Sequence, residues 1–163
     1  TLAEKAGTKI KNRRIQTKIS IVINREGKIE KYDLESDVEF LGRVPKMRLV
    51  EEYSSATAVV MPSLHEGFGL PAIEAMSCET PLVATTSGAI PEIVSSESGI
   101  LVPPGDVEKL AEAMETIHKN PEKRKEMGAE GRKRVEEKFT WEEAAERVTE
   151  VYKEVSNASN DRF

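Results

Sequence analysis

Short apolar runs alternate with segments of helical periodicity along most of the chain, and this alternation limits the fold more than any other feature. The runs fall at residues 18–24, 38–42, 57–63, 81–86 and 99–106. Several are rich in β-branched residues, which favours strands, while the segments after them repeat apolar residues at helical spacing. Strands that alternate with helices form mainly parallel sheets covered on both faces. The sequence therefore predicts the α/β class.

Helix signals follow several of the expected strands. Met47, Val50 and Tyr53 lie at helical spacing after the second strand. Pro71 and Pro91 each suit the first turn of a helix, because an N–H group at that position has no partner inside the helix to lose.

Three further helices are expected in the second half of the chain. Asp106 is a suitable N-cap for the helix after the fifth strand, and Pro121 opens the next one. The last helix is expected to run from Trp141 to about Val155, with apolar residues on one face. Trp141 and Tyr152 are expected to pack this helix against the sheet.

Composition excludes several classes of protein. The chain has 163 residues, which suits one domain, and its net charge of −5 argues against nucleic acid as the main partner. A single cysteine excludes an internal disulfide and fits a reducing compartment. No run approaches the roughly 18 apolar residues of a membrane span. No signal-peptide pattern is present, so a cytoplasmic location is expected. Because residue 1 is Thr and not Met, we expect a piece of a longer protein.

Residues 61–76, MPSLHEGFGLPAIEAM, place two glutamates eight positions apart, Glu66 and Glu74. Glu66 is expected in the loop at the carboxyl end of the third strand, where α/β folds bind their ligands. Glu74 is expected in the first turn of the helix that Pro71 starts. The two carboxylates therefore lie at a position that suits a binding site.

The backbone between the glutamates supplies hydrogen-bond donors. Gly67 and Gly69 allow positive φ and a close approach to a ligand. The N–H groups of Gly69, Leu70 and Ala72 are expected near a helix N-terminus, which favours anions or hydroxyls. Donors beside two carboxylate acceptors suit a ligand with both phosphates and neighbouring hydroxyls, such as a nucleotide sugar.

Simpler interpretations compete at these positions. Glu74 would also complement the dipole of its helix, and Glu66 would also suit a solvated loop. Phe68 is equally suited to a core position and to a ligand platform. His65 is most simply a loop residue, and Glu92 is most simply an acidic residue in the first turn of a short helix.

The segment EGFGLPAIE resembles the E-x7-E signature of retaining glycosyltransferases with the GT-B fold (glycosyltransferase group 1, family 4). Five further blocks match that family in order, over roughly residues 38 to 155: FLGRVP, ATAVVMPS, PLVATTSGAIPEIV, GILVPPGD and FTWEEAAERVTEVYKEV. The resemblance implies that residues 1–163 are the C-terminal, donor-binding domain, one Rossmann-like half of a GT-B fold. Residues 1–37 match the family poorly, and the N-terminal acceptor-binding domain is missing.

The resemblance also implies roles for the residues of this segment. Glu74 would accept hydrogen bonds from the ribose hydroxyls of the donor. Glu66 would be the catalytic residue, holding a hydroxyl of the transferred sugar and steadying positive charge at its anomeric carbon. The N–H groups of Phe68, Gly69 and Leu70 would contact sugar hydroxyls or the distal phosphate.

One part of the family pattern is absent. Such enzymes usually neutralise the leaving diphosphate with an Arg and a Lys in an R-x4-K-G-like segment, and this sequence has none. Residues 4–14, EKAGTKIKNRR, are basic but lack the spacing. Arg43 is the remaining candidate. Ser87 and Gly88, in the segment TTSGAIPE, are expected to line the same cleft.

The expected activity of the whole protein is the transfer of a hexose from a nucleotide diphosphate sugar to an acceptor hydroxyl, with retention and without a metal or other cofactor. The chain alone is expected to be inactive. Two alternatives stay open: a non-catalytic nucleotide-binding module, and a protein-interaction module that uses the last helix. The base, the sugar, the acceptor, the oligomeric state and any membrane association of the full protein also stay open.

Overall fold

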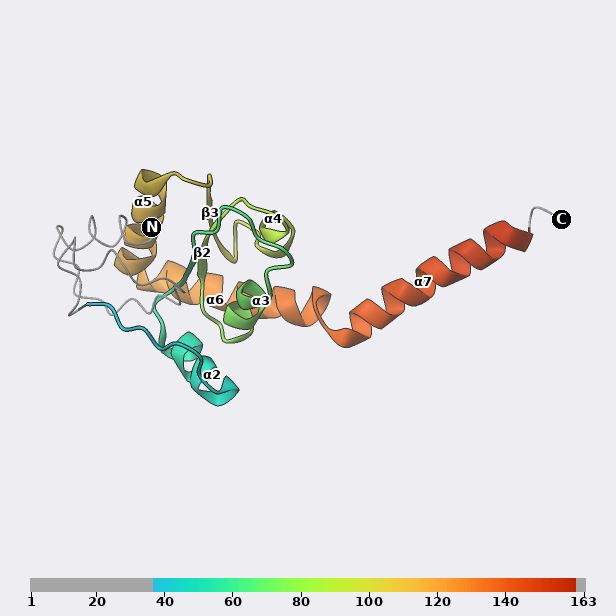
Figure 1. Cartoon of the computed structure of the whole chain (residues 1–163), viewed down its shortest axis with the longest axis horizontal. Helices are drawn as coiled ribbons and strands as arrows, with labels where there is room; N and C mark the ends of the chain where they lie inside the picture. The colour runs from blue at the N-terminus through green and yellow to red at the C-terminus, as the bar shows by residue number, and fades with distance from the viewer. Residues whose placement is uncertain (1–36, 161–163) are drawn as a thin grey trace.

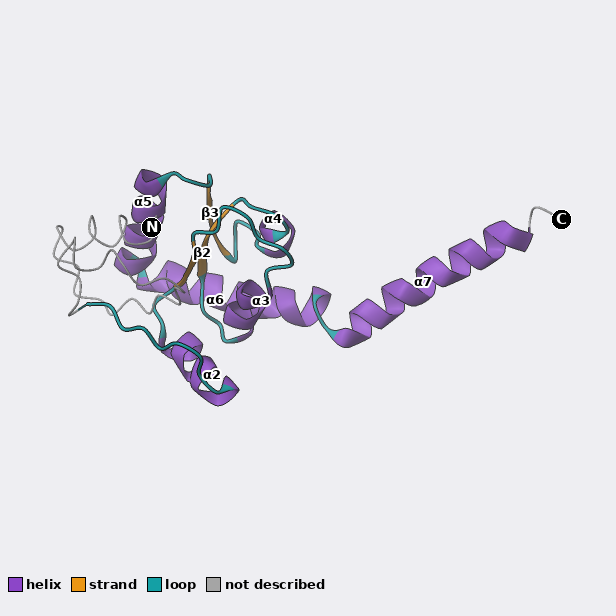
Figure 2. Cartoon of the chain, viewed as in Figure 1, coloured by secondary structure: helices purple, strands orange, loops and turns teal. Residues whose placement is uncertain are grey.

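The computed structural model describes residues 37–160, and the side chains of residues 37–157. The described strands are β1 (Val59–Met61), β2 (Leu82–Thr85) and β3 (Gly99–Val102). They form one parallel sheet in the order β1-β2-β3, with Val59 opposite Leu82 and Leu82 opposite Gly99. Figure 2 shows the sheet enclosed by helices.

Helices cover both faces of this sheet, and of the described helices only the last lies apart from it (Figure 1). The described helices are α2 (Lys46–Ser55), α3 (Leu70–Ser77), α4 (Ile90–Ile93), α5 (Val107–Lys119), α6 (Pro121–Lys138) and α7 (Trp141–Asn160). Leu82 and Ala84 of β2 belong to one buried cluster, with residues of α3 and α4, whereas Val83 belongs to another, with residues of α5. Successive side chains of a strand point to opposite faces, so the two clusters are the two faces of the sheet. The predicted α/β, Rossmann-like parallel sheet with helices on both faces is confirmed (Figure 1).

Proline and aspartate mark the helix starts as the sequence predicts. Pro71 and Pro91 lie in the first turns of α3 and α4, and Pro121 is the first residue of α6. The Asp106 carboxylate caps α5 by accepting a hydrogen bond from the N–H of Lys109 at 3.0 Å. Each of these residues meets the backbone requirement of a helix N-terminus.

The predicted strand at 38–42 is wrong, because these residues have no regular secondary structure. A strand needs a neighbour for its hydrogen bonds, and none of the three described strands pairs with this segment. Phe40 is 41% exposed, while Leu41 is half-buried. The predicted strand at 18–24 lies outside the described residues.

The helix α2 is confirmed, but its inward face differs from the spacing noted in the sequence. Tyr53 is buried and Leu49 packs against the same core cluster, whereas Met47 is 73% exposed and Val50 is 37% exposed. Leu49 and Tyr53 are four positions apart, so they lie on one face of the helix. The helix therefore contacts the sheet domain along a narrow stripe.

The last helix, α7, begins at Trp141 as predicted and continues to Asn160. It projects away from the rest of the molecule (Figure 1). The prediction that Trp141 and Tyr152 pack against the sheet is wrong, because their exposed fractions are 88% and 72%. Val148, Val151 and Val155 are exposed as well, so this helix presents an apolar face that no described residue covers. No helix of residues 37–160 is long and apolar enough to cross a membrane.

Candidate functional site

A hollow of about 380 Å³ lies between α2, β1 and the start of α3. Its lining residues are Glu39, Leu41, Leu49, Glu52, Tyr53, Ala56, Val59, Val60, Met61, Pro62, Ser63, Glu66, Pro71 and Glu74. The walls are mainly apolar, with a few polar groups, which is typical of small-molecule sites. Both glutamates of the E-x7-E segment line it, so the structure brings Glu66 and Glu74 to one place.

The carboxylate of Glu66 is held by its own loop. The Ser63 hydroxyl donates a hydrogen bond to Oε2 of Glu66 at 3.2 Å, and the N–H of Gly67 donates to Oε1 at 3.2 Å. Glu66 is half-buried, so it is not simply a solvated loop residue. Its carboxylate is fixed beside the hollow, and its catalytic role stays a prediction.

The end of β2 and the residues after it contact the Glu66 loop. The Thr85 hydroxyl donates a hydrogen bond to the carbonyl of Ser63 at 2.5 Å. Gly88 has φ +55°, and a Cβ at this position would lie 1.8 Å from the carbonyl oxygen of Glu66. Only glycine fits such a close backbone approach. Ser87 is 5% exposed, and its Oγ lies 3.3 Å from Oγ1 of Thr85. Ser87 and Gly88 therefore lie behind the Glu66 loop, and neither lines the hollow.

The start of α3 offers backbone donors. Gly69 is the N-cap with φ +80°, as expected, whereas Gly67 does not adopt a positive φ. The N–H of Ala72 donates to the carbonyl of Gly69 at 2.9 Å, so the prediction that it is available to a ligand is wrong. Within residues 37–160, the N–H groups of Phe68, Gly69 and Leu70 have no acceptor. These three groups are the ones that the family resemblance assigns to the ligand. Phe68 itself is 63% exposed and not in the core.

The position of Glu74 in its helix differs from the prediction by one residue. Helix α3 begins at Leu70, so Glu74 is its fifth residue and lies beyond the first turn. The effect of the helix dipole falls off within the first turn. The dipole therefore contributes little at Glu74, which is an exposed residue in the wall of the hollow.

The sequence indicates only a helical spacing for Tyr53 and no role in the site. Its hydroxyl donates a hydrogen bond to Oε2 of Glu74, at 3.4 Å. Burial, and after it the negative charge and the hydrogen bond of Glu74, together raise the pKa of Tyr53 to about 12. Tyr53 is thus neutral and a donor near neutral pH. Its four-residue spacing from Leu49 could have indicated that it faces inward.

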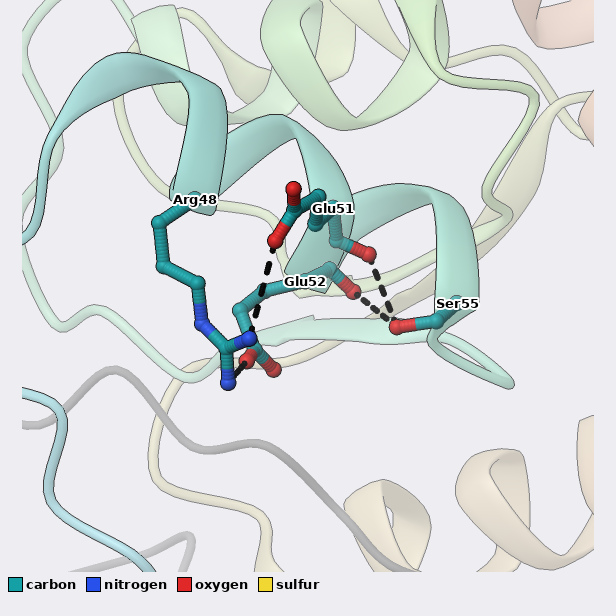
Figure 3. A network of polar contacts seen from close by, with 4 residues as sticks. All are labelled: Arg48, Glu51, Glu52 and Ser55. Atoms are coloured by element: carbon teal, nitrogen blue, oxygen red, sulfur yellow. Dashed lines mark hydrogen bonds and ion pairs between the residues drawn. The ribbon is translucent and has the colours of Figure 1, made fainter.

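Charges around the hollow are mainly negative. Among the described residues that line it are four glutamates and no Lys or Arg. Glu52 is paired with Arg48 on α2, with Nη2 and Oε1 2.5 Å apart, and Arg48 also lies 3.6 Å from Glu51 (Figure 3). Arg43 is exposed and does not line the hollow. The basic segment 4–14 lies outside the described residues. No group of three His, Cys, Asp or Glu side chains in the described range is placed to hold a metal.

Solved structures share this fold. A sucrose-phosphate synthase from Thermosynechococcus elongatus matches 95% of this chain with a TM-score of 0.77 and 30% identity, over 42% of its own length. Anabaena HepE in complex with UDP matches 78% of this chain with a TM-score of 0.70 and 26% identity, over 35% of its own length. The fold is that of one Rossmann-like half of a GT-B glycosyltransferase.

The chain belongs to the glycosyl transferases group 1 family, whose family model matches residues 23–134. One relative is the GDP-mannose-dependent monoacylated alpha-(1-6)-phosphatidylinositol monomannoside mannosyltransferase of Corynebacterium glutamicum. It is 35% identical over 126 residues, which cover 73% of this chain and 33% of the relative. The chain thus spans about a third of the length of this relative.

Proposed function

We propose that this chain is the C-terminal, donor-binding domain of a retaining glycosyltransferase. The whole protein would move a hexose from a nucleotide diphosphate sugar to an acceptor hydroxyl, and an N-terminal domain would bind the acceptor. One observation carries the proposal: Glu66 and Glu74 line one hollow, beside backbone N–H groups at the start of α3 that have no acceptor among the described residues.

Electrostatics suggests which part of the site binds the nucleoside of the nucleotide sugar and which part binds its diphosphate. The charged groups in the mainly apolar wall of the hollow are all carboxylates, which accept hydrogen bonds from hydroxyls and repel phosphates. The start of α3 presents N–H groups, which favour phosphate oxygens. The nucleoside would therefore occupy the hollow, with Glu74 accepting from the ribose hydroxyls. The diphosphate would lie outside it, at the N–H groups of Phe68, Gly69 and Leu70.

The transferred sugar would then lie near Glu66. The two hydrogen bonds from its loop hold this carboxylate in place, so it could bind a sugar hydroxyl and stabilise positive charge at the anomeric carbon. Stabilisation of the leaving diphosphate would come from the helix N-terminus and from cationic side chains, without a metal. Arg43 stays a candidate for such a cation, although it does not line the hollow.

The similar proteins support a nucleotide sugar as the donor, and they differ in the base. The Corynebacterium relative depends on GDP-mannose by its name, and Anabaena HepE is solved with UDP. We therefore leave the base to the experiment.

Calorimetric titration of the chain with UDP, GDP and ADP tests the proposal. We expect one nucleotide to bind best, and Glu74→Ala to weaken that binding by roughly tenfold to a hundredfold, because a hydrogen bond to a charged group contributes about 1.5–3 kcal/mol. The matched control is Glu122→Ala, which removes an exposed acidic residue from the first turn of α6. It should leave the affinity unchanged.

Two results would contradict parts of the proposal. If none of the nucleotides binds, the chain is not a donor-binding domain, and the protein-interaction module becomes the better interpretation. If a nucleotide binds but the full-length protein transfers no sugar, the non-catalytic module is favoured. In an active full-length protein, Glu66→Gln should lower kcat by more than it changes KM, because its interaction forms mainly in the transition state.

A further inference from the structure

The contact between Tyr53 and Glu74 joins two helices across the wall of the hollow. Tyr53 is on α2 and is 7% exposed, while Glu74 is on α3 and is an exposed residue. The phenol hydroxyl donates to Oε2 of Glu74. Both residues line the hollow, so the contact forms part of its surface.

A second link fixes Tyr53 relative to α3. The Thr80 hydroxyl donates a hydrogen bond to the carbonyl of Tyr53 at 2.7 Å, and this bond is buried. Thr80 follows α3, and its N–H donates to the carbonyl of Ala75 at 3.1 Å. The backbone of Tyr53 is therefore held by a residue just past the C-terminal end of α3, the helix that carries Glu74.

The carboxylate of Glu74 has one oxygen engaged and one left for a ligand. Within residues 37–157, Tyr53 is the only hydrogen-bond partner of that carboxylate. An exposed glutamate samples several rotamers, and a ligand that binds it must stop this motion at a cost in entropy. A donor that is itself buried and anchored restricts the carboxylate before the ligand arrives.

We propose that Tyr53 is a positioning residue: it holds the Glu74 carboxylate at the wall of the hollow, with Oε1 directed to the hydroxyls of the bound nucleoside. This inference rests on the proposed function, because it assumes that Glu74 binds the ligand. It assigns Tyr53 a role in the site, so that α2 as well as α3 contributes to the affinity for the nucleotide sugar.

The test is a double-mutant cycle on nucleotide binding. Tyr53→Phe removes only the hydroxyl, and Tyr152→Phe makes the same change at an exposed position of α7. For the nucleotide that binds best, we expect Tyr53→Phe to raise Kd about 3- to 10-fold. Tyr152→Phe should leave Kd unchanged. In the Glu74→Ala background, Tyr53→Phe should have no further effect, because its partner is gone.

Three outcomes would overturn the proposal, and they differ from one another. An equal loss of affinity from Tyr53→Phe with and without Glu74 would show a general structural role. Unchanged affinity in Tyr53→Phe, beside weakened affinity in Glu74→Ala, would reject the role of Tyr53 and keep the proposed function. No binding of UDP, GDP or ADP to the unaltered chain would reject both.

A second measurement needs no nucleotide and leaves Tyr53 in place. In a chain with Tyr32→Phe and Tyr152→Phe, ultraviolet absorbance reports the ionisation of Tyr53 alone. Adding Glu74→Gln should shift this ionisation to lower pH, because the nearby negative charge and its hydrogen bond are removed. An unchanged titration would show that the phenol does not contact Glu74 in solution, and would overturn the proposal even if Tyr53→Phe folds poorly.

Discussion

Helices α6 and α7 follow one another along the chain, and both are long and rich in charged residues, yet only α6 is packed. Met127, Gly128, Gly131 and Val135 of α6 are buried. In α7, no residue from 141 to 157 is buried. Figure 1 shows α6 behind the sheet and α7 extending from its end into open space.

The difference shows what makes a helix pack in this molecule. The apolar stripe of α7 is more regular than that of α6, but no described residue covers it. Helix α6 packs through small residues that allow a close approach, and through two arginines. Arg132 donates to the carbonyl of Ser77, and Arg134 donates to the carbonyls of Glu92 and Ile93. These carbonyls lie at the ends of α3 and α4, where helices leave acceptors unsatisfied. Apolar periodicity alone therefore does not tell whether the same chain supplies the contact.

The largest effect is expected from Gly128→Ala. A Cβ at this position would lie 2.1 Å from the carbonyl oxygen of Glu79, so α6 must move away from the end of α3. Overpacking of this kind costs about 3 kcal/mol, more than the roughly 1 kcal/mol that alanine gains in helix propensity. Urea unfolding, followed by circular dichroism, measures the loss.

The matched control lies in the same helix. A Cβ at Gly131 would lie 3.4 Å from Cγ of Met76, an ordinary contact. Gly131→Ala should therefore leave the stability unchanged or raise it by up to about 1 kcal/mol. Equal effects at the two positions would show that α6 does not approach α3 as closely as the structure indicates.

The next effect compares one valine from each helix. Val135 of α6 is 8% exposed, whereas Val148 of α7 is 54% exposed. Val135→Ala should cost about 2 kcal/mol, because it leaves a cavity in the core. Val148→Ala should stay within about 0.5 kcal/mol. A substantial loss of stability for Val148→Ala in this chain would mean that α7 is covered in solution, by a second copy or by the rest of the chain.

The same contrast explains how much of the fold the sequence could predict. The alternation of apolar runs and helices predicts β1, β2 and β3 because each run is local and its turns are marked by Pro, Gly or Asp. The strand expected at 38–42 has the same local pattern but no described neighbour to pair with. Likewise, the exposure of Trp141 depends on the absence of a covering surface among the described residues. Local pattern predicts an element, whereas its partner is a property of the whole fold.

A smaller effect is expected from the polar contacts of α6. Arg134 donates from Nε to the carbonyl of Ile93 at 2.6 Å and from Nη2 to that of Glu92 at 2.8 Å. Arg134→Met keeps much of the side-chain volume and removes both donors, so it should cost about 1–2 kcal/mol. Lys133→Met is the control. Lys133 is exposed, and its Nζ lies 3.9 Å from Oε1 of Glu130, so it forms only a weak surface ion pair. Its effect should be within about 0.5 kcal/mol. Equal losses for the two variants would mean that Arg134 does not hold the end of α4.

The candidate site was predictable to a similar extent. One contiguous segment is enough to place Glu66, Glu74 and the backbone N–H groups between them. In this segment the strand, the loop and the start of the helix follow one another directly. The contribution of Tyr53 could not, because it comes from a helix that precedes the segment and depends on how α2 packs on α3. Gly88 could be assigned to the same region, but its close approach to the Glu66 carbonyl is a tertiary contact.

The smallest effect compares a buried tyrosine of the packed region with an exposed tyrosine of α7. Folding raises the pKa of Tyr53 to about 12, mainly through burial, while an unfolded chain loses this proton near pH 10. Between these values the folded state binds more protons than the unfolded state, so the free energy of unfolding falls as pH rises. From pH 9 to pH 11 this residue alone lowers the free energy of unfolding by roughly 1 kcal/mol. Lysines also titrate in this range, so the informative quantity is the difference between variants.

Urea unfolding at pH 9 and pH 11 should show a shallower decline for Tyr53→Phe than for the unaltered chain, and an unchanged decline for Tyr152→Phe. If Tyr53→Phe declines as steeply as the unaltered chain, the phenol is not shielded, and the packed contact between α2 and α3 is looser than the structure indicates.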